Sequence, residues 1–159
     1  MANPRWLTDA QFRAWIGYRR MRLLLDAEVT RDLTRESGLS APDYDVLSAL
    51  MDAPERRARV TELARRMLWS KSRLSRHLGR MRERGLVERI EDTGEGRHAD
   101  VVLTEAGERA IVEAAPGHVE SVRRHFIDLL TDEQLRVFGD VADTVLSQLP
   151  PTASDAERD

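Results

Sequence analysis

The residues with the most evident chemistry gather in one stretch, WSKSRLSRHLGRMRERG, at positions 69–85. The stretch holds five arginines and the only lysine of the chain. An arginine side chain offers a fork of N–H donors that fits phosphate oxygens and guanine edges, and serine hydroxyls add short-range hydrogen bonds. The alternative is that an arginine-rich coding preference has filled the solvated face of an ordinary helix.

A helical wheel over residues 70–82 divides this stretch into two faces. Leu74, Leu78 and Met81 recur at spacings of four and three and form an apolar stripe that we expect to be buried. Ser70 is the expected N-cap, which turns the positive end of the helix outward, where it can bind a phosphate. The face opposite the stripe consists of Ser72, Arg73, Arg76, Gly79 and Arg80.

The basic charge is confined to the middle of the chain. All 159 residues together carry 25 Lys and Arg against 28 Asp and Glu, a net charge of −3. Residues 56–99 alone hold 13 Lys and Arg against 6 Asp and Glu, a net charge of +7, which leaves −10 for the remainder. A basic middle between acidic flanks is typical of a DNA-binding module on an acidic scaffold.

Other chemistries find little support in the sequence. The chain has no cysteine, so disulfides, thiolate nucleophiles and cysteine-ligated zinc are excluded. The segment TGEGRH has only two glycines and lies between two β-prone runs, which fits a hairpin better than a nucleotide-binding loop. His118 and His125 are seven positions apart, too far along one helix to share an ion. We therefore expect no catalysis, no cofactor and no metal.

Capping motifs predict the helix that precedes the basic region. Thr8 to Gln11 reads as a capping box, so a helix should begin near Asp9. It should end where Gly38 adopts the left-handed conformation. At roughly 28 residues this helix is too long to bury its length against so short a chain, which indicates a partner subunit.

The segments around the basic stretch are shorter. Ser40, with Pro42 in the first turn, predicts a second helix. Val60 is expected to supply a short strand and Thr61 to cap the helix TELARRM. Downstream, GLVERIED and ADVVLT are two β-prone runs, and the glycines at 94 and 96 suit a hairpin tip between them.

The C-terminal part is expected to be helical. A helix begins at Thr104, is bent or interrupted at Pro116 and Gly117, and then resumes. A capping box at Thr131 to Gln134 opens a last helix, and the polar tail after Pro150 is expected to be disordered. The apolar stripe of the last helix consists of Leu135, Phe138, Ala142, Val145, Leu146 and Leu149.

Helix, turn, basic helix and β-hairpin, in this order, predict a winged helix-turn-helix. The run VTELARRMLWSKSRLSRHLGRMRERGLVERIEDTGEGRHADVVLTEAG, at positions 60–107, resembles the MarR-type transcription regulators. The resemblance implies a mainly α fold with a small β-wing, and a homodimer that binds double-stranded DNA at a pseudo-palindromic operator. The implied organisation is an N-terminal dimerisation helix (1–39), a DNA-binding lobe (40–104, wing about 87–104), C-terminal dimerisation helices (105–150) and a tail (151–159).

The resemblance also implies which residues contact DNA. Residues on the recognition helix and on the wing match positions that the family uses for bases, phosphates and the minor groove. Asp92 matches the acidic residue that braces the wing arginine. The implied contacts are Ser70, Lys71, Ser72, Arg73, Ser75, Arg76, Arg80, Arg97 and His98, with Lys71 and Arg80 assigned to phosphates and Arg97 to the minor groove.

Three positions depart from the family pattern or are unusual for their place. Leu68 occupies a turn position where glycine is usual, and Gly79 replaces a common aspartate. Both departures concern the geometry and the bracing of the recognition helix. Trp69 is bulky for its site and is expected to fill the core under the turn.

Family members often release DNA when a small aromatic or anionic effector binds between the dimer helices and the DNA-binding lobe. The first helix offers Trp15, Tyr18, Arg19 and Arg22, which could receive such an effector. The competing interpretation is that Trp15 and Tyr18 pack at the dimer interface while the arginines are solvated.

The sequence thus predicts a cytoplasmic, homodimeric, ligand-responsive DNA-binding transcription regulator that acts as a repressor. The cytoplasmic location is expected because the N-terminal residues lack the apolar core of a signal peptide and no window is apolar enough to span a membrane. Two alternatives remain open: an architectural DNA-binding protein without an effector, and a winged-helix module that meets an acidic protein.

Overall fold

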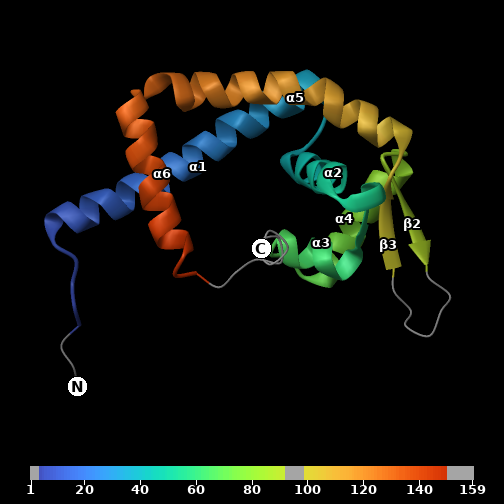
Figure 1. The fold of residues 1–159 in the computed structure, drawn as a ribbon, viewed down its shortest axis with the longest axis horizontal. Coiled ribbons are helices and arrows are strands. Elements are labelled where there is room, and N and C mark those ends of the chain that lie inside the picture. Colours follow the sequence, from blue (N-terminus) through green and yellow to red (C-terminus); the bar gives the residue numbers. More distant parts are fainter. Residues whose placement is uncertain (1–3, 92–98, 150–159) are drawn as a thin grey trace.

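The computed structural model describes residues 4–91 and 99–149. Within these residues the chain is mainly helical and carries one small antiparallel sheet. Figure 1 shows a lobe built from the middle of the sequence, with the first and the last helices forming an arm beside it. The predicted fold class, mainly α with a winged helix-turn-helix, is confirmed.

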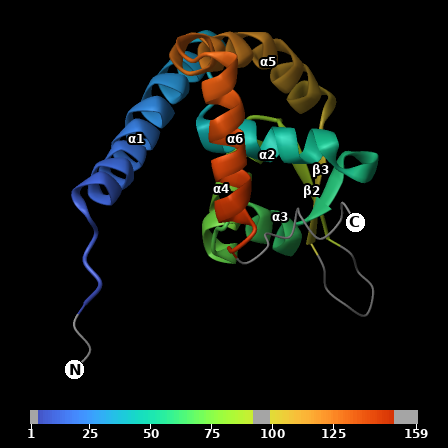
Figure 2. The same cartoon turned by 60° about the vertical axis from the view of Figure 1, so that its left-hand side comes forward.

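The first helix, α1 (Asp9–Ser37), is 29 residues long, as its capping motifs predict. The Thr8 hydroxyl accepts from the Gln11 N–H, and Gln11 reaches back to the Thr8 backbone. Gly38 ends the helix with φ 70°. Figures 1 and 2 both show the N-terminal half of α1 projecting away from the lobe, so most of this helix lacks an intramolecular partner.

Helix α2 (Ala41–Asp52) begins with the predicted Ser40 capping box and is followed by a 3₁₀ turn, η1 (Pro54–Arg56). The strand and the helix that come next differ from the prediction. Strand β1 is Arg57–Arg59, and helix α3 (Val60–Arg66) already begins at the predicted strand residue.

The reason for this difference is tertiary packing. Val60 is 3% exposed, so the first residue of α3 belongs to the core, while all three residues of β1 pair with another strand. Thr61 is wrong as a cap because the N-cap residue is Arg59, whose side chain makes no capping hydrogen bond. A helix held by a buried face does not depend on its cap.

The predicted basic helix is α4 (Lys71–Glu83). Ser70 is its N-cap, and its hydroxyl accepts from the Arg73 N–H at 3.3 Å. The turn between α3 and α4 contains Leu68, which has φ 54° and is 79% exposed.

The predicted wing strands are β2 (Val87–Glu91) and β3 (Ala99–Leu103). They pair antiparallel from Val87 opposite Leu103 to Glu91 opposite Ala99, and β1 lies on the other side of β3. The predicted hairpin tip at positions 94–96 lies outside the described residues.

Helix α5 (Glu105–His125) begins at the predicted N-cap Thr104 and continues through Pro116. An interruption was one predicted outcome, and it is wrong. The helix is buried on both sides of the proline, at Ala114 and at Ser121, so packing holds the two halves in one element. Figure 1 shows α5 as a curved helix, as a proline inside a helix leads one to expect.

The chain closes with a 3₁₀ turn, η2 (Ile127–Leu129), and helix α6 (Asp132–Leu146). The Thr131 capping box forms as predicted. The predicted stripe extends one residue too far, since Leu149 lies beyond the end of α6. Most of this stripe is exposed, including Phe138 and Val145.

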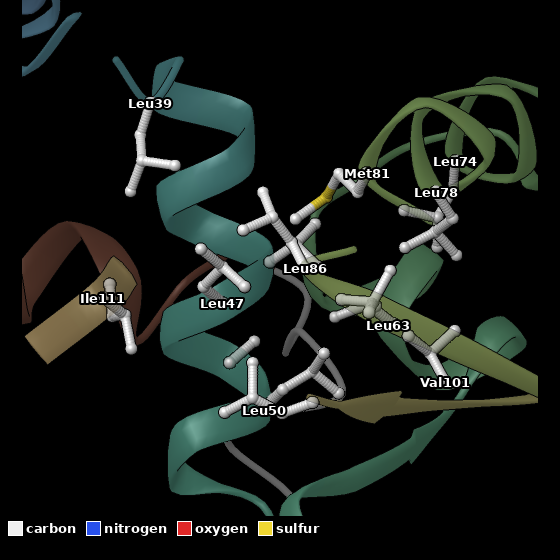
Figure 3. Packing of buried hydrophobic residues seen from close by; sticks show 14 of the residues in the cluster. Leu39, Leu47, Leu50, Leu63, Leu74, Leu78, Met81, Leu86, Val101 and Ile111 are labelled. Carbon is white, nitrogen blue, oxygen red and sulfur yellow. The ribbon is translucent and has the colours of Figure 1, made fainter. Parts of the chain in front are cut away.

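The core of the lobe lies between α2, α3, α4, the sheet and the first half of α5. Figure 3 shows Leu47 and Leu50 of α2 facing side chains from α3, α4 and β3. The predicted stripe of α4 takes part, since Leu74, Leu78 and Met81 are each at most 4% exposed. None of the helices in the described residues is long and apolar enough to cross a membrane.

Candidate nucleic-acid interface

The two faces predicted for α4 are present. The apolar stripe is buried together with His77, and the opposite face is open to solvent. Ser75 lies between the two faces and is half-buried. The predicted contact residues that are exposed on or next to this helix are Ser70, Lys71, Ser72, Arg73, Arg76 and Arg80.

The arginines of α4 differ in what holds them. Arg84, just after the helix, donates to Asp43 Oδ2 at 2.7 Å and to the Gly38 carbonyl at 3.3 Å. Arg80 donates to His77 Nδ1 at 3.0 Å. The side chain of Arg76 makes no hydrogen bond or ion pair with any described residue. Arg84 is therefore committed to the fold, while Arg76 keeps all its donors for a ligand.

Asp43 ties the recognition helix to α2. It is 3% exposed, and its Oδ2 accepts from the Ser40 N–H at 2.9 Å as well as from Arg84. Burial alone raises the pKa of Asp43, but the hydrogen bonds from Arg84 and Ser40 outweigh it and hold the pKa below its usual range. The carboxylate is therefore charged at neutral pH and fixes the C-terminal end of α4 on the start of α2.

His77 extends this tie toward the middle of α4. Its Nε2 lies 3.1 Å from Asp43 Oδ1, without the alignment of a full hydrogen bond. Burial lowers the pKa of His77, and although Asp43 raises it, the net pKa stays below its usual value. The imidazole is therefore neutral at neutral pH, with Nδ1 accepting from Arg80 and the proton on Nε2.

Trp69 packs against the core, as predicted, and it also contacts the recognition helix. The guanidinium carbon of Arg73 lies 3.9 Å from the centre of its ring. The ring of His77 meets it edge-on, with 5.5 Å between the ring centres. The turn residue thus touches one side of the first two turns of α4.

The two other unusual positions now have a structural description. Leu68 adopts the left-handed backbone conformation for which glycine is usual, so the turn geometry is kept at a steric cost. At Gly79 an added Cβ would meet no atom within 4 Å, so the absent aspartate leaves an open surface. The bracing of the recognition helix comes from Asp43 and Arg84 instead.

A second basic feature lies beside α4. A cavity of about 110 Å³ opens between α3, α4 and the sheet. Its lining includes three cationic and two hydroxyl side chains, which suit a phosphate group. They are Arg59, Thr61, Lys71, Ser75 and Arg89. Sequence reasoning did not predict Arg59 and Thr61 as binding residues, although the basic run RRAR before α3 could have indicated the first of them.

The predicted wing contacts Arg97 and His98, and the bracing residue Asp92, lie outside the described residues. The strands β2 and β3 that lead to them stand next to α4 in Figure 1.

The predicted effector residues lie on α1, away from the lobe. Trp15 and Tyr18 stack with 6.0 Å between their rings, and Arg19 lies 5.9 Å from the centre of the Trp15 ring. These three form one group, whereas Arg22 makes no contact with them; all four are exposed. A groove of about 630 Å³ between α1, the end of α5 and α6 includes none of them. Its lining is mostly apolar and includes Met21, Phe126 and Val137.

The two histidines of α5 have separate partners. The ring of His118 lies tilted against that of Tyr44 with 4.3 Å between the ring centres, while His125 Nε2 lies 2.9 Å from the buried carboxylate of Asp32. Ser121 also donates to Asp32 at 2.8 Å, and these contacts hold the pKa of Asp32 at about 2. Across residues 4–91 and 99–149, no group of three His, Asp or Glu side chains is arranged to hold a metal ion.

Comparisons with known proteins agree with this description. The sequence pattern of the MarR family matches residues 37–98. Among characterised proteins, the transcriptional regulator HosA of Escherichia coli is 30% identical over 122 residues, which cover 77% of this chain and 88% of HosA.

Two solved structures are similar over nearly the whole chain. The crystal structure of Sco3205, a MarR family transcriptional regulator from Streptomyces coelicolor in complex with DNA, has 34% identity and a TM-score of 0.86, covering 95% of this chain and 94% of Sco3205. That of AbsC, a MarR family transcriptional regulator from the same organism, has 37% identity and a TM-score of 0.80, covering 91% of this chain and all of AbsC.

Proposed function

Because the chain belongs to the MarR family of DNA-binding transcription regulators and is not an enzyme, we propose that it acts as a homodimeric repressor that a small-molecule effector releases from its operator. The observation that carries the DNA-binding part is the exposed face of α4, where Arg76 has no partner in the described residues and Arg73 has only an aromatic ring. Free guanidinium donors on a capped helix fit the base edges of the major groove.

Phosphate contacts surround this face in the proposal. Lys71 and Arg80 flank it, and the cavity that Arg59 and Thr61 line adds an anion-binding site at the edge of the helix. Phosphate contacts fix the position of a protein on DNA, and base contacts select the sequence. Arg97 and His98 are proposed to add contacts from the wing.

The homodimer is proposed because two helices expose apolar stripes. Only Asp32 and Leu33 are buried in α1, and no residue of α6 is buried. So much exposed apolar surface marks an interaction site. The residues in question are Phe12, Ile16, Met21, Leu23 and Leu24 of α1, and Val137, Phe138, Val141, Val145 and Leu146 of α6.

A second copy of the chain is the proposed partner of these stripes. Two-fold pairing presents two recognition helices to one duplex and therefore predicts a pseudo-palindromic operator. A dimer that lies across a promoter blocks polymerase, so repression is the proposed outcome. The group formed by Trp15, Tyr18 and Arg19 is the proposed receptor for an aromatic or anionic effector, because it combines stacking surface with a cation.

The test begins with DNA fragments that the full chain selects from a random-sequence duplex library. The expected result is a palindromic consensus, bound by two chains as measured by light scattering. Arg73→Ala and Arg76→Ala should each lower the preference for this consensus over a scrambled duplex by at least about fivefold, the effect of losing one base contact, and leave the dimer intact. Arg109→Ala is the matched control, since this exposed arginine lies on α5 and, among the described residues, pairs only with Glu105.

Unchanged sequence preference in both α4 variants would show that α4 does not recognise the DNA sequence. Thermal-shift screening of phenols and aromatic acids then tests the effector. A compound that stabilises the protein and also releases the selected DNA supports the switch, and DNA binding without any such compound favours an architectural role.

A further inference from the structure

Trp69 stands between the turn of the helix-turn-helix and two residues of α4. Arg73 and His77, four positions apart and therefore on one side of the helix, contact the same indole. Arg73 approaches the face of the ring, with 3.9 Å from its guanidinium carbon to the ring centre. His77 approaches at an interplanar angle of 84°.

The indole itself is fixed from several directions. The backbone N–H of Trp69 donates to the Ala64 carbonyl at 2.9 Å and anchors the residue, and the indole packs against the buried core. His77, which backs it, is 6% exposed and lies against the carboxylate of Asp43. The ring is therefore a rigid platform on the side of the recognition helix that faces the turn.

The contact leaves the donors of Arg73 available. Within the described residues its side chain makes no hydrogen bond and no ion pair, so the ring is its only partner. A cation over an aromatic face is attracted by the ring as a whole and gives up no N–H group to an acceptor. Arg80 and Arg84 differ, because each spends donors inside the protein.

We propose that Trp69 is a positioning residue for DNA recognition: its ring orders the guanidinium of Arg73 before DNA arrives, and this sets the sequence preference of the protein. This rests on the proposed function, in which Arg73 reads a base. A flexible arginine must be immobilised on binding, and an arginine already held loses less freedom. The expected gain is about threefold to tenfold in preference for the correct sequence.

A double-mutant cycle separates this role from simple core filling. The probes are the duplex that the wild-type chain selects from a random library and a scrambled duplex of the same composition. Trp69→Met keeps an apolar filler without an aromatic face and should lower the preference about threefold to tenfold. In the Arg73→Ala background the same change should have almost no further effect. Trp69→Phe, which retains an aromatic face, should restore most of the preference and also provides a second cycle if Trp69→Met folds poorly.

Arg76 supplies the matched control. Among the described residues no hydrogen bond, ion pair or ring contact joins it to Trp69, so the effects of Trp69→Met and Arg76→Ala on binding to the selected duplex should multiply. Equal effects of Trp69→Met with and without Arg73 would overturn the positioning role while leaving the proposed function intact. If instead neither arginine variant changes the preference, the recognition surface itself is wrong and the positioning role falls with it.

Discussion

The ion pair between Asp43 and Arg84 leads to a prediction about both the stability of the protein and its DNA binding. The perturbation is Asp43→Ala. It removes the reciprocal capping box of α2, the 2.7 Å charge-assisted bond to Arg84, and the carboxylate next to the buried Nε2 of His77. It does not touch the exposed face of α4.

The expected loss follows from these contacts. Removal of a helix cap costs about 0.5–2 kcal/mol. The charge-assisted bond to Arg84 adds roughly 1–2 kcal/mol. This value is already lowered for solvent screening, because the Arg84 side chain is 44% exposed. Together they predict a decrease of about 1.5–4 kcal/mol in the free energy of unfolding. Since Arg84 also anchors the end of α4, affinity for the selected duplex should fall as well.

The assay is urea unfolding of Asp43→Ala, Arg84→Ala and the double variant, with Ser40→Ala as the control that weakens only the cap. The two single changes should be coupled by about 0.5–2 kcal/mol, and Ser40→Ala should show no coupling with Arg84→Ala. Because the pKa of Asp43 is lowered on folding, its stabilising effect is present above the ordinary value of 3.8 and is lost as the pH falls below it. Asp43→Ala should therefore flatten the acid limb of the stability profile. Additive effects of Asp43→Ala and Arg84→Ala, within about 0.5 kcal/mol, would refute the reasoning.

Four further predictions concern other parts of the molecule. Leu68→Gly should raise the free energy of unfolding by about 0.5–1 kcal/mol, because glycine relieves the left-handed strain at φ 54° but adds chain entropy; a decrease in urea unfolding would show that the strain is absent. Arg59→Ala and Lys71→Ala should each reduce the log-log slope of DNA affinity against salt by about 0.9, measured by fluorescence anisotropy, and an unchanged slope would remove that residue from the phosphate contacts. Val141→Glu, on the exposed stripe of α6, should convert the dimer to a monomer in light scattering, and an intact dimer would place the interface elsewhere. His77→Gln should weaken the loss of stability below pH 6.5, since a pKa lowered on folding makes protonation favour the unfolded chain; an unaltered pH profile would contradict the buried neutral histidine.

Features that depend on neighbouring residues could be predicted from the sequence. The capping boxes at Thr8, Ser40 and Thr131 form as predicted, because each is made by side chains and backbone groups three positions apart. The apolar stripe of α4 is buried as its spacing predicts, since a helix places such residues on one face. The resemblance to the MarR family also led to the correct fold class.

Features that depend on distant residues could not be predicted. The start of α3 and the unbroken path of α5 through Pro116 are decided by which side chains find a place in the core, and local pattern alone gave a strand at Val60 and left a helix break open.

The division among the basic residues is the clearest case. In the sequence Arg73, Arg76, Arg80 and Arg84 are equivalent members of one basic stretch. In the fold, Arg84 donates to a carboxylate 41 positions away, Arg80 donates to a buried histidine, and Arg73 lies over an indole ring. Arg76 has no such partner among the described residues. Helical periodicity is local, and it was enough to predict that a basic, capped helix would present one face to solvent. Which of these arginines remain available to DNA depends on tertiary packing, because Asp43 comes from another helix and because the core fixes where the neighbouring rings of Trp69 and His77 lie.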